Sequence, residues 1–103
     1  MAQSKTYTFT GKGKGSKLLR LKLTTEQPIT KDSIIQDIAI NGDFFAHPED
    51  AFDELEQYLI GKPVRDIGFW FTKGIDLFKL TVYGLLPEDL TAAVEVMVSQ
   101  GDC

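Results

Sequence analysis

The stretch "DIAINGDFFAHPEDAFDELEQYLIGK", residues 37–62, changes its hydrophobic period part-way along. In its first half Ile38 and Ile40 alternate with polar or small residues, which is typical of a β-strand with one buried face. In its second half apolar residues recur at helical spacing, with Phe52 and Leu55 on the same stripe. A strand that leads directly into an amphipathic helix predicts a mixed α+β domain.

Two stretches before this segment also alternate. Residues 17–24 place three leucines on one face and Arg20, Lys22 and Thr24 on the other, and Tyr7 and Phe9 show the same pattern earlier. Such runs predict half-buried strands, and antiparallel pairing is the simplest way to join them. The strand face that follows them is formed by Ile34, Ile38 and Ile40.

Two helices have clear start and stop signals. The first spans residues 48–60, with proline in its first turn, acidic residues at its positive end and Gly61 after its last periodic residue. The second opens at Pro87, carries an apolar face that includes Leu90 and Met97, and closes at Gly101. Together with the strands they predict sheet packed against helices.

Residues 64–83 fit two patterns. The spacing of their apolar residues is helical in the first part, although Gly68 and Gly74 each cost about 1 kcal/mol in a helix interior. Phe78, Leu80 and Val82 alternate as in a strand that ends at Gly84. We therefore expect a helix followed by an extended segment, and because three aromatics stand together at residues 69–71, at least one of them must lie under a loop or at an interface.

The length of 103 residues suits one domain covering residues 1–103, and the net charge of −4 argues against nucleic acid as a partner. The single cysteine, Cys103, cannot form an internal disulfide. The sequence contains no apolar run that would span a membrane and no signal-peptide core, so we expect a cytoplasmic protein without a membrane partner.

Positive charge gathers in the first quarter of the chain, around the glycine-rich stretch "GKGKGSK" at residues 11–17. Backbone amides among lysines suit a phosphate cradle, yet the spacing is not that of a nucleotide-binding P-loop. Two interpretations stay open: a basic loop that reaches toward a ligand held by another protein, or a solvated hairpin loop.

The segment 42–47 holds the other candidate residues. Phe44 and Phe45 are neighbours, so in an extended chain one enters the core and the other is free to meet a partner. Asp43 is placed to accept hydrogen bonds from nearby amides. His47 has no second histidine or nearby thiol for catalysis or metal binding, and we expect it to have a structural role at the helix entry.

The acidic residues of the first helix do not suggest catalysis, because paired-carboxylate chemistry needs the two acids held in a cleft with pKa values pushed apart. We interpret them as a solvated face. They are Glu49, Asp50, Asp53, Glu54 and Glu56.

Three segments together resemble the small accessory, or C-terminal, domain of lipoate–protein ligases. These are "KGKGSKLLRLKL", then "GDFF" followed by "HPE" and an amphipathic helix, and finally "YGLLPEDLTAAV". The similarity extends from about Lys12 to Val98. Ser16 stands where the family often has a second glycine, and "IGFWFTKGIDLFKL" is not typical of that part of the family.

The resemblance implies a small two-layer α+β domain, mostly antiparallel sheet packed against helices, similar to the SufE/NifU-like fold. It implies a separate, non-catalytic accessory subunit of a bipartite ligase, in which the catalytic subunit would hold lipoate, ATP and magnesium. That subunit would be the direct partner and apo lipoyl domains would be indirect ones. No catalytic or metal-binding residue is expected in this chain, and no cofactor bound to it alone. The residues implied in ligand or partner binding are Lys12, Lys14, Gly15, Lys17, Leu18, Arg20, Gly42, Asp43, Phe44, Phe45 and His47.

Two other functions stay open. The chain would also suit a stand-alone binding or regulatory module of the iron–sulfur-scaffold type, without a ligase partner, although a single cysteine cannot hold a cluster. It would also suit a regulator that binds lipoate or a lipoylated domain.

Overall fold

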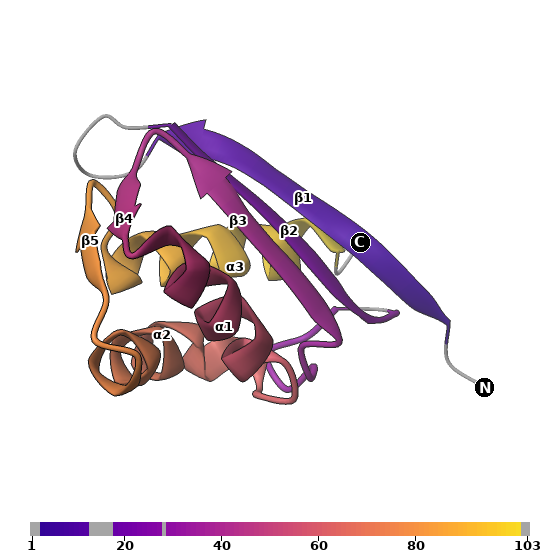
Figure 1. Cartoon of the computed structure of the whole chain (residues 1–103). Coiled ribbons are helices and arrows are strands. Elements are labelled where there is room, and N and C mark those ends of the chain that lie inside the picture. Colours follow the sequence, from indigo (N-terminus) through magenta and orange to yellow (C-terminus); the bar gives the residue numbers. More distant parts are fainter. Residues whose placement is uncertain (1–2, 13–17, 28, 102–103) are drawn as a thin grey trace.

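The computed structural model describes residues 3–12, 18–27 and 29–101. Two layers are visible in Figure 1, a three-stranded sheet and a group of helices, with a short two-stranded sheet at one end. The order of elements is β1 (Ser4–Lys12), β2 (Leu18–Glu26), β3 (Asp37–Gly42), β4 (Phe45–His47), α1 (Glu49–Leu59), η1 (Val64–Asp66), α2 (Ile67–Leu77), β5 (Thr81–Tyr83) and α3 (Pro87–Gly101). The predicted fold class, α+β with antiparallel sheet packed against helices, is confirmed.

The larger sheet has the order β1-β2-β3, and both pairs are antiparallel. Leu21 of β2 lies opposite Phe9 on one side and Ile40 on the other, so the apolar residues of three strands share one face. The leucines and isoleucines of this face are buried, as the period-two pattern predicted. Strand β2 continues to Glu26, two residues beyond the predicted end.

The prediction that Ile34 belongs to the third strand is wrong. Strand β3 begins only at Asp37, and Ile34 is 49% exposed and forms an isolated bridge with Pro63. Ile35 is fully buried instead, and its N–H donates to the carbonyl of Lys62 at 2.9 Å. Because the chain bends between Ile34 and the start of β3 at Asp37, the alternation that holds in β3 does not extend back to Ile34.

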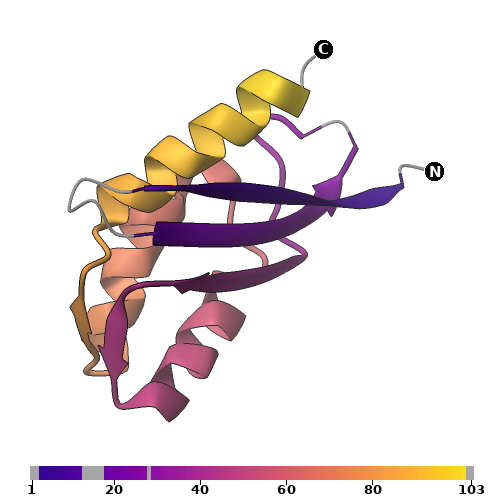
Figure 2. The same cartoon turned by 90° about the horizontal axis from the view of Figure 1, so that it is seen from above.

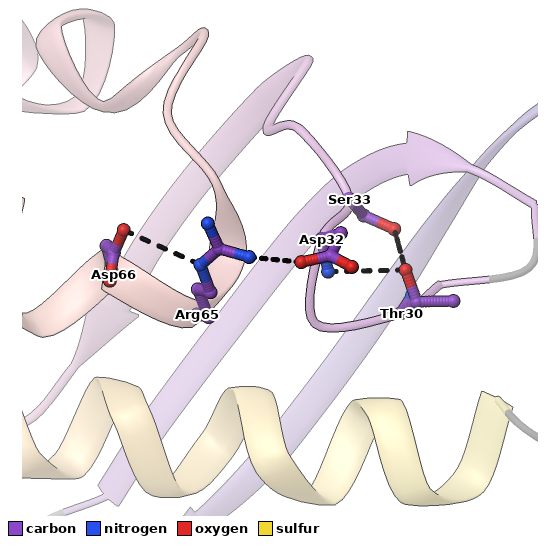
Figure 3. A network of polar contacts seen from close by, with 5 residues as sticks. All are labelled: Thr30, Asp32, Ser33, Arg65 and Asp66. Carbon is purple, nitrogen blue, oxygen red and sulfur yellow. Dashed lines mark hydrogen bonds and ion pairs between the residues drawn. The ribbon is translucent and has the colours of Figure 1, made fainter.

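Side-chain contacts connect the loop before β3 to η1, the short helix that precedes α2 (Figure 3). Arg65 forms an ion pair with Asp32 and lies 3.8 Å from the carboxylate of Asp66. Inside the loop, the hydroxyl of Ser33 accepts a hydrogen bond from the backbone N–H of Thr30 at 2.8 Å. These charged groups are exposed, so we assign the contacts a role in shaping the loop rather than a large share of stability.

The helices lie on the apolar side of the sheet (Figures 1 and 2). Helix α1 packs beside β3, α3 packs beside β1, and α2 contacts both of the other helices. Helix α1 is one residue shorter at each end than predicted, because Pro48 and Ile60 have extended backbones with ψ of 145° and 133°. Helix α3 has the predicted bounds.

Helix α2 and strand β5 confirm the helix-then-extended prediction for residues 64–83, but the strand is limited to Thr81–Tyr83. Phe71 is fully buried, whereas Phe69 is 56% exposed, as expected for one of three adjacent aromatics. The two glycines of α2 are sites of close helix contact: a methyl group on Gly74 would lie 2.0 Å from Cδ1 of Leu55 in α1. Close packing therefore offsets their poor helix propensity.

Glu56 does not belong to a solvated acidic face, contrary to the prediction. Its Oε2 accepts a hydrogen bond at 2.7 Å from the N–H of Ile40, on the edge of β3 that points away from β2. The neighbouring N–H of Ile38 donates to Oδ1 of Asp37 at 3.0 Å. These two carboxylates satisfy edge donors of the sheet, which would otherwise be open to pairing with another strand.

Candidate functional site

One end of the molecule brings together segments that are distant in sequence: the end of β1 and the start of β2, the corner between β3 and β4, and the turn from β5 into α3 (Figure 1). Gly42 is a point of close approach between these segments, since a methyl group there would lie 2.1 Å from the carbonyl oxygen of Leu18. Its φ of 151° also disfavours other residues. The backbone N–H of Asp43 then donates to the same Leu18 carbonyl at 2.9 Å. The "GDFF" segment is thus held against Leu18, the first residue of β2.

Phe44 and Phe45 point to opposite sides, as predicted. The ring of Phe44 packs on Phe52 of α1, with ring centroids 5.2 Å apart. Phe45 is 58% exposed and lies opposite Tyr83 in the two-stranded sheet of β4 and β5. One phenylalanine therefore anchors the segment to the core, and the other is presented to solvent.

Of the candidate residues in and beside the basic loop, only some are described. Lys12 is the last residue of β1 and lies opposite Leu18, and Arg20 lies opposite both Thr10 and Asn41. The side chains of Lys12 and Arg20 are exposed, and Leu18 is half-buried. Lys14, Gly15 and Lys17 fall outside the described residues.

His47 and Asp43 are both exposed at this end of the molecule. His47 is exposed, lies opposite Thr81 in the short sheet, and precedes Pro48 through a cis peptide bond. The backbone N–H of Asp43 donates to the Leu18 carbonyl and the residue is exposed, and acceptance of amide hydrogen bonds by its carboxylate stays a prediction. Among residues 3–12, 18–27 and 29–101, no group of three or more His, Cys, Asp or Glu is arranged to hold a metal ion.

Three further residues lie at this end and were not among the predicted site residues: Tyr83, Gly84 and Leu86. Gly84 has φ of 88°, and a methyl group on it would lie 3.4 Å from the carbonyl oxygen of Asp43, so this turn packs directly on the "GDFF" segment. Tyr83 and Leu86 are 65% and 45% exposed. Only the glycine carried a signal in the sequence, because three-residue strands are too short to show a period.

A shallow hollow of about 250 Å³ borders Phe45 on the side of α1. Its lining includes Gly42, Phe44 and Phe52, together with the carboxylates of Glu49 and Asp53. The arrangement can present a basic edge, an apolar centre and an acidic rim to a partner. A larger cavity of about 370 Å³, lined by residues of α3 and η1, is separate from this end.

No protein-family model and no curated protein matches the chain. The chain is similar to a chain in the solved structure of an archaeal lipoylation system, a bipartite lipoate protein ligase and its E2 lipoyl domain from Thermoplasma acidophilum. The two are 29% identical, the TM-score is 0.67, and the similarity covers 89% of this chain and 97% of that one. The likeness therefore extends over nearly the whole of both chains.

Among the described residues, no helix is both long enough and apolar enough to cross a membrane.

Proposed function

We propose that this chain works in protein lipoylation, as the non-catalytic accessory subunit of a bipartite lipoate–protein ligase. The observation that carries the proposal is its similarity, over nearly its full length, to a chain of a bipartite ligase system. Supporting it, Leu18 and Gly42, which belong to the two motifs of the sequence resemblance, meet at one end of the fold. The cytoplasmic location stays a prediction.

The proposed role is to enable ATP-dependent activation of lipoate to lipoyl-adenylate on a separate catalytic subunit. That subunit would hold lipoate, ATP and magnesium, and would pass the lipoyl group to apo lipoyl domains. Activation concentrates negative charge on the phosphates, and a lysine brought near them offsets that charge in a site shielded from water. Lys14 and Lys17 of the basic loop are the proposed source of that charge.

The described residues next to the basic loop form contacts that hold the start of β2 in place. Because Gly42 and Asp43 contact the Leu18 carbonyl, the strand that leaves the loop is fixed against β3 and β4. Phe44, packed on Phe52, ties this corner to α1 and the core. A loop whose base is rigid loses less entropy when it orders on a partner, so bracing favours productive binding.

The test is lipoate-dependent ATP–pyrophosphate exchange by the candidate catalytic subunit, with and without this chain. We expect exchange to appear, or to rise at least tenfold, only when both proteins are present. Unchanged exchange with a partner that still transfers pre-formed lipoyl-adenylate would overturn the accessory role, and would favour the stand-alone binding or regulatory module.

Charge removal tests the lysines. Lys14→Gln and Lys17→Gln should lower the stimulated exchange while the far-UV circular dichroism and melting temperature stay unchanged. The matched control is Lys73→Gln, which removes an exposed lysine on α2 instead. Equal exchange by the loop variants and the control would overturn the phosphate role of the loop.

A further inference from the structure

Exposed apolar side chains gather at the same end as the candidate site. Among the described residues, seven large hydrophobic side chains are exposed, and three of them belong to β4, β5 and the turn that follows. Phe45 and Tyr83 lie directly opposite each other in the ladder, so their side chains leave the same face of the short sheet. Leu86 follows three residues after Tyr83. We call these three residues the apolar patch.

The patch is held in place by backbone geometry. Strands β4 and β5 pair along their whole length, from Phe45 opposite Tyr83 to His47 opposite Thr81. The backbone N–H of Leu86 donates to Oδ2 of Asp89 at 3.0 Å, which fixes the start of α3. Aromatic side chains presented by a fixed backbone lose little entropy on binding, and such residues dominate the energetics of protein interfaces.

Charged side chains of both signs lie at this end of the molecule. Lys12 and Arg20 are exposed where β1 ends and β2 begins. Glu49 and Asp53 line the hollow next to Phe45. An apolar centre with a polar rim is the usual anatomy of a protein–protein interface.

We propose that the apolar patch docks on the catalytic subunit of the ligase, beside its nucleotide-binding pocket, with the basic strand ends facing the phosphates. This inference rests on the proposed function. Charge sets the orientation, because the exposed cations of Lys12 and Arg20 are complementary to a bound nucleotide and the carboxylates of Glu49 and Asp53 are not. Arg20 lies opposite Asn41, which lines the same hollow as Phe45, so a surface that brings Arg20 to the phosphates also brings Phe45 against the protein that holds the nucleotide.

The test compares two phenylalanines of nearly equal exposure. Phe45 is 58% exposed on β4, and Phe69 is 56% exposed on α2. The dissociation constant for the catalytic subunit, measured by titration calorimetry, should rise at least tenfold for Phe45→Ser and for Tyr83→Ser, and change less than twofold for Phe69→Ser. Circular dichroism and thermal melting of each variant alone should show that all three fold.

A second measurement tests the orientation. Binding should be tighter when the catalytic subunit is loaded with MgATP, and this gain should shrink at high salt and in Lys12→Gln and Arg20→Gln variants. A gain that these variants leave unchanged would overturn the orientation.

Three other outcomes would overturn the docking surface. If wild type stimulates exchange but Phe45→Ser and Phe69→Ser bind alike, the proposed function stands and the patch assignment fails. If wild type does not bind the catalytic subunit at all, both fail. If light scattering shows that wild type forms a dimer that Phe45→Ser abolishes, the patch serves a second copy of this chain instead.

Discussion

At the scale of single residues, Glu56 combines opposing influences on one carboxylate. Burial raises its pKa above the ordinary value of 4.5, the hydrogen bond from Ile40 lowers it, and the negative charges of Asp53 and Asp37 raise it further. The net effect is an increase. The folded protein therefore binds this proton more tightly than the unfolded chain, and the resulting stabilisation is complete below the unfolded pKa and is lost as pH rises through the folded one.

Glu56→Gln should accordingly be more stable than wild type at neutral pH, because the amide keeps an acceptor for the Ile40 N–H and carries no charge. We expect a melting temperature higher by a few degrees, with the difference vanishing as pH falls below 4.5. Thermal melts across this pH range measure it, with the exposed Glu54→Gln as control. Identical pH profiles for Glu56→Gln and wild type would contradict the assignment.

Gly42→Ala tests the close contact at the candidate site. The added methyl group would lie 2.1 Å from the Leu18 carbonyl oxygen, so the corner must move and the Asp43 hydrogen bond must weaken. We expect a loss of roughly 2 kcal/mol in the free energy of unfolding, measured with denaturant. The control is Gly61→Ala, which has a φ of 91° but open space around the new methyl group. The proposed bracing is wrong if both variants lose the same stability.

At the scale of elements, Gly74 shows how packing overrides helix propensity. In an exposed helix, glycine to alanine gains about 1 kcal/mol. Here the methyl group would overlap Leu55 of α1, so Gly74→Ala should instead lower the free energy of unfolding by about 1–2 kcal/mol. In a Leu55→Ala background the obstacle is removed and the same change should become stabilising. A double-mutant cycle by denaturant unfolding measures this coupling, and simple additivity would exclude the contact.

The elements also show where the sequence was informative. Alternation predicted the buried faces of β1, β2 and β3, and capping residues predicted α1 and α3, because both signals are local. Ile34 and the extent of β5 were missed because they depend on where a turn falls and on a pairing between distant segments. The site follows the same rule: Gly42 and Phe45 were predicted from a contiguous motif, but Tyr83 and Leu86 join them only through the β4–β5 ladder.

At the scale of the whole molecule, one hydrophobic core includes residues from the three-stranded sheet and from all three helices. The Cα radius of gyration is 12.9 Å, close to the value of about 13 Å expected for one compact domain of this length. These observations support the proposal that residues 1–103 form a single domain. Because both layers share this core, neither layer has a hydrophobic core of its own, and we expect neither to fold separately.

We therefore expect the chain alone to unfold in one cooperative transition. Trp70 reports on contact between two helices, since its ring lies 6.1 Å from that of Tyr58 in α1 and 5.0 Å from Nζ of Lys62. Far-UV circular dichroism reports on the sheet and helices together. Denaturant midpoints from Trp70 fluorescence and from circular dichroism should coincide, whereas an earlier fluorescence transition would show that α1 and α2 separate before the sheet opens. Coincidence would also mean that a subunit prepared alone is already folded, so any activity that appears on mixing would come from docking and not from folding on the partner.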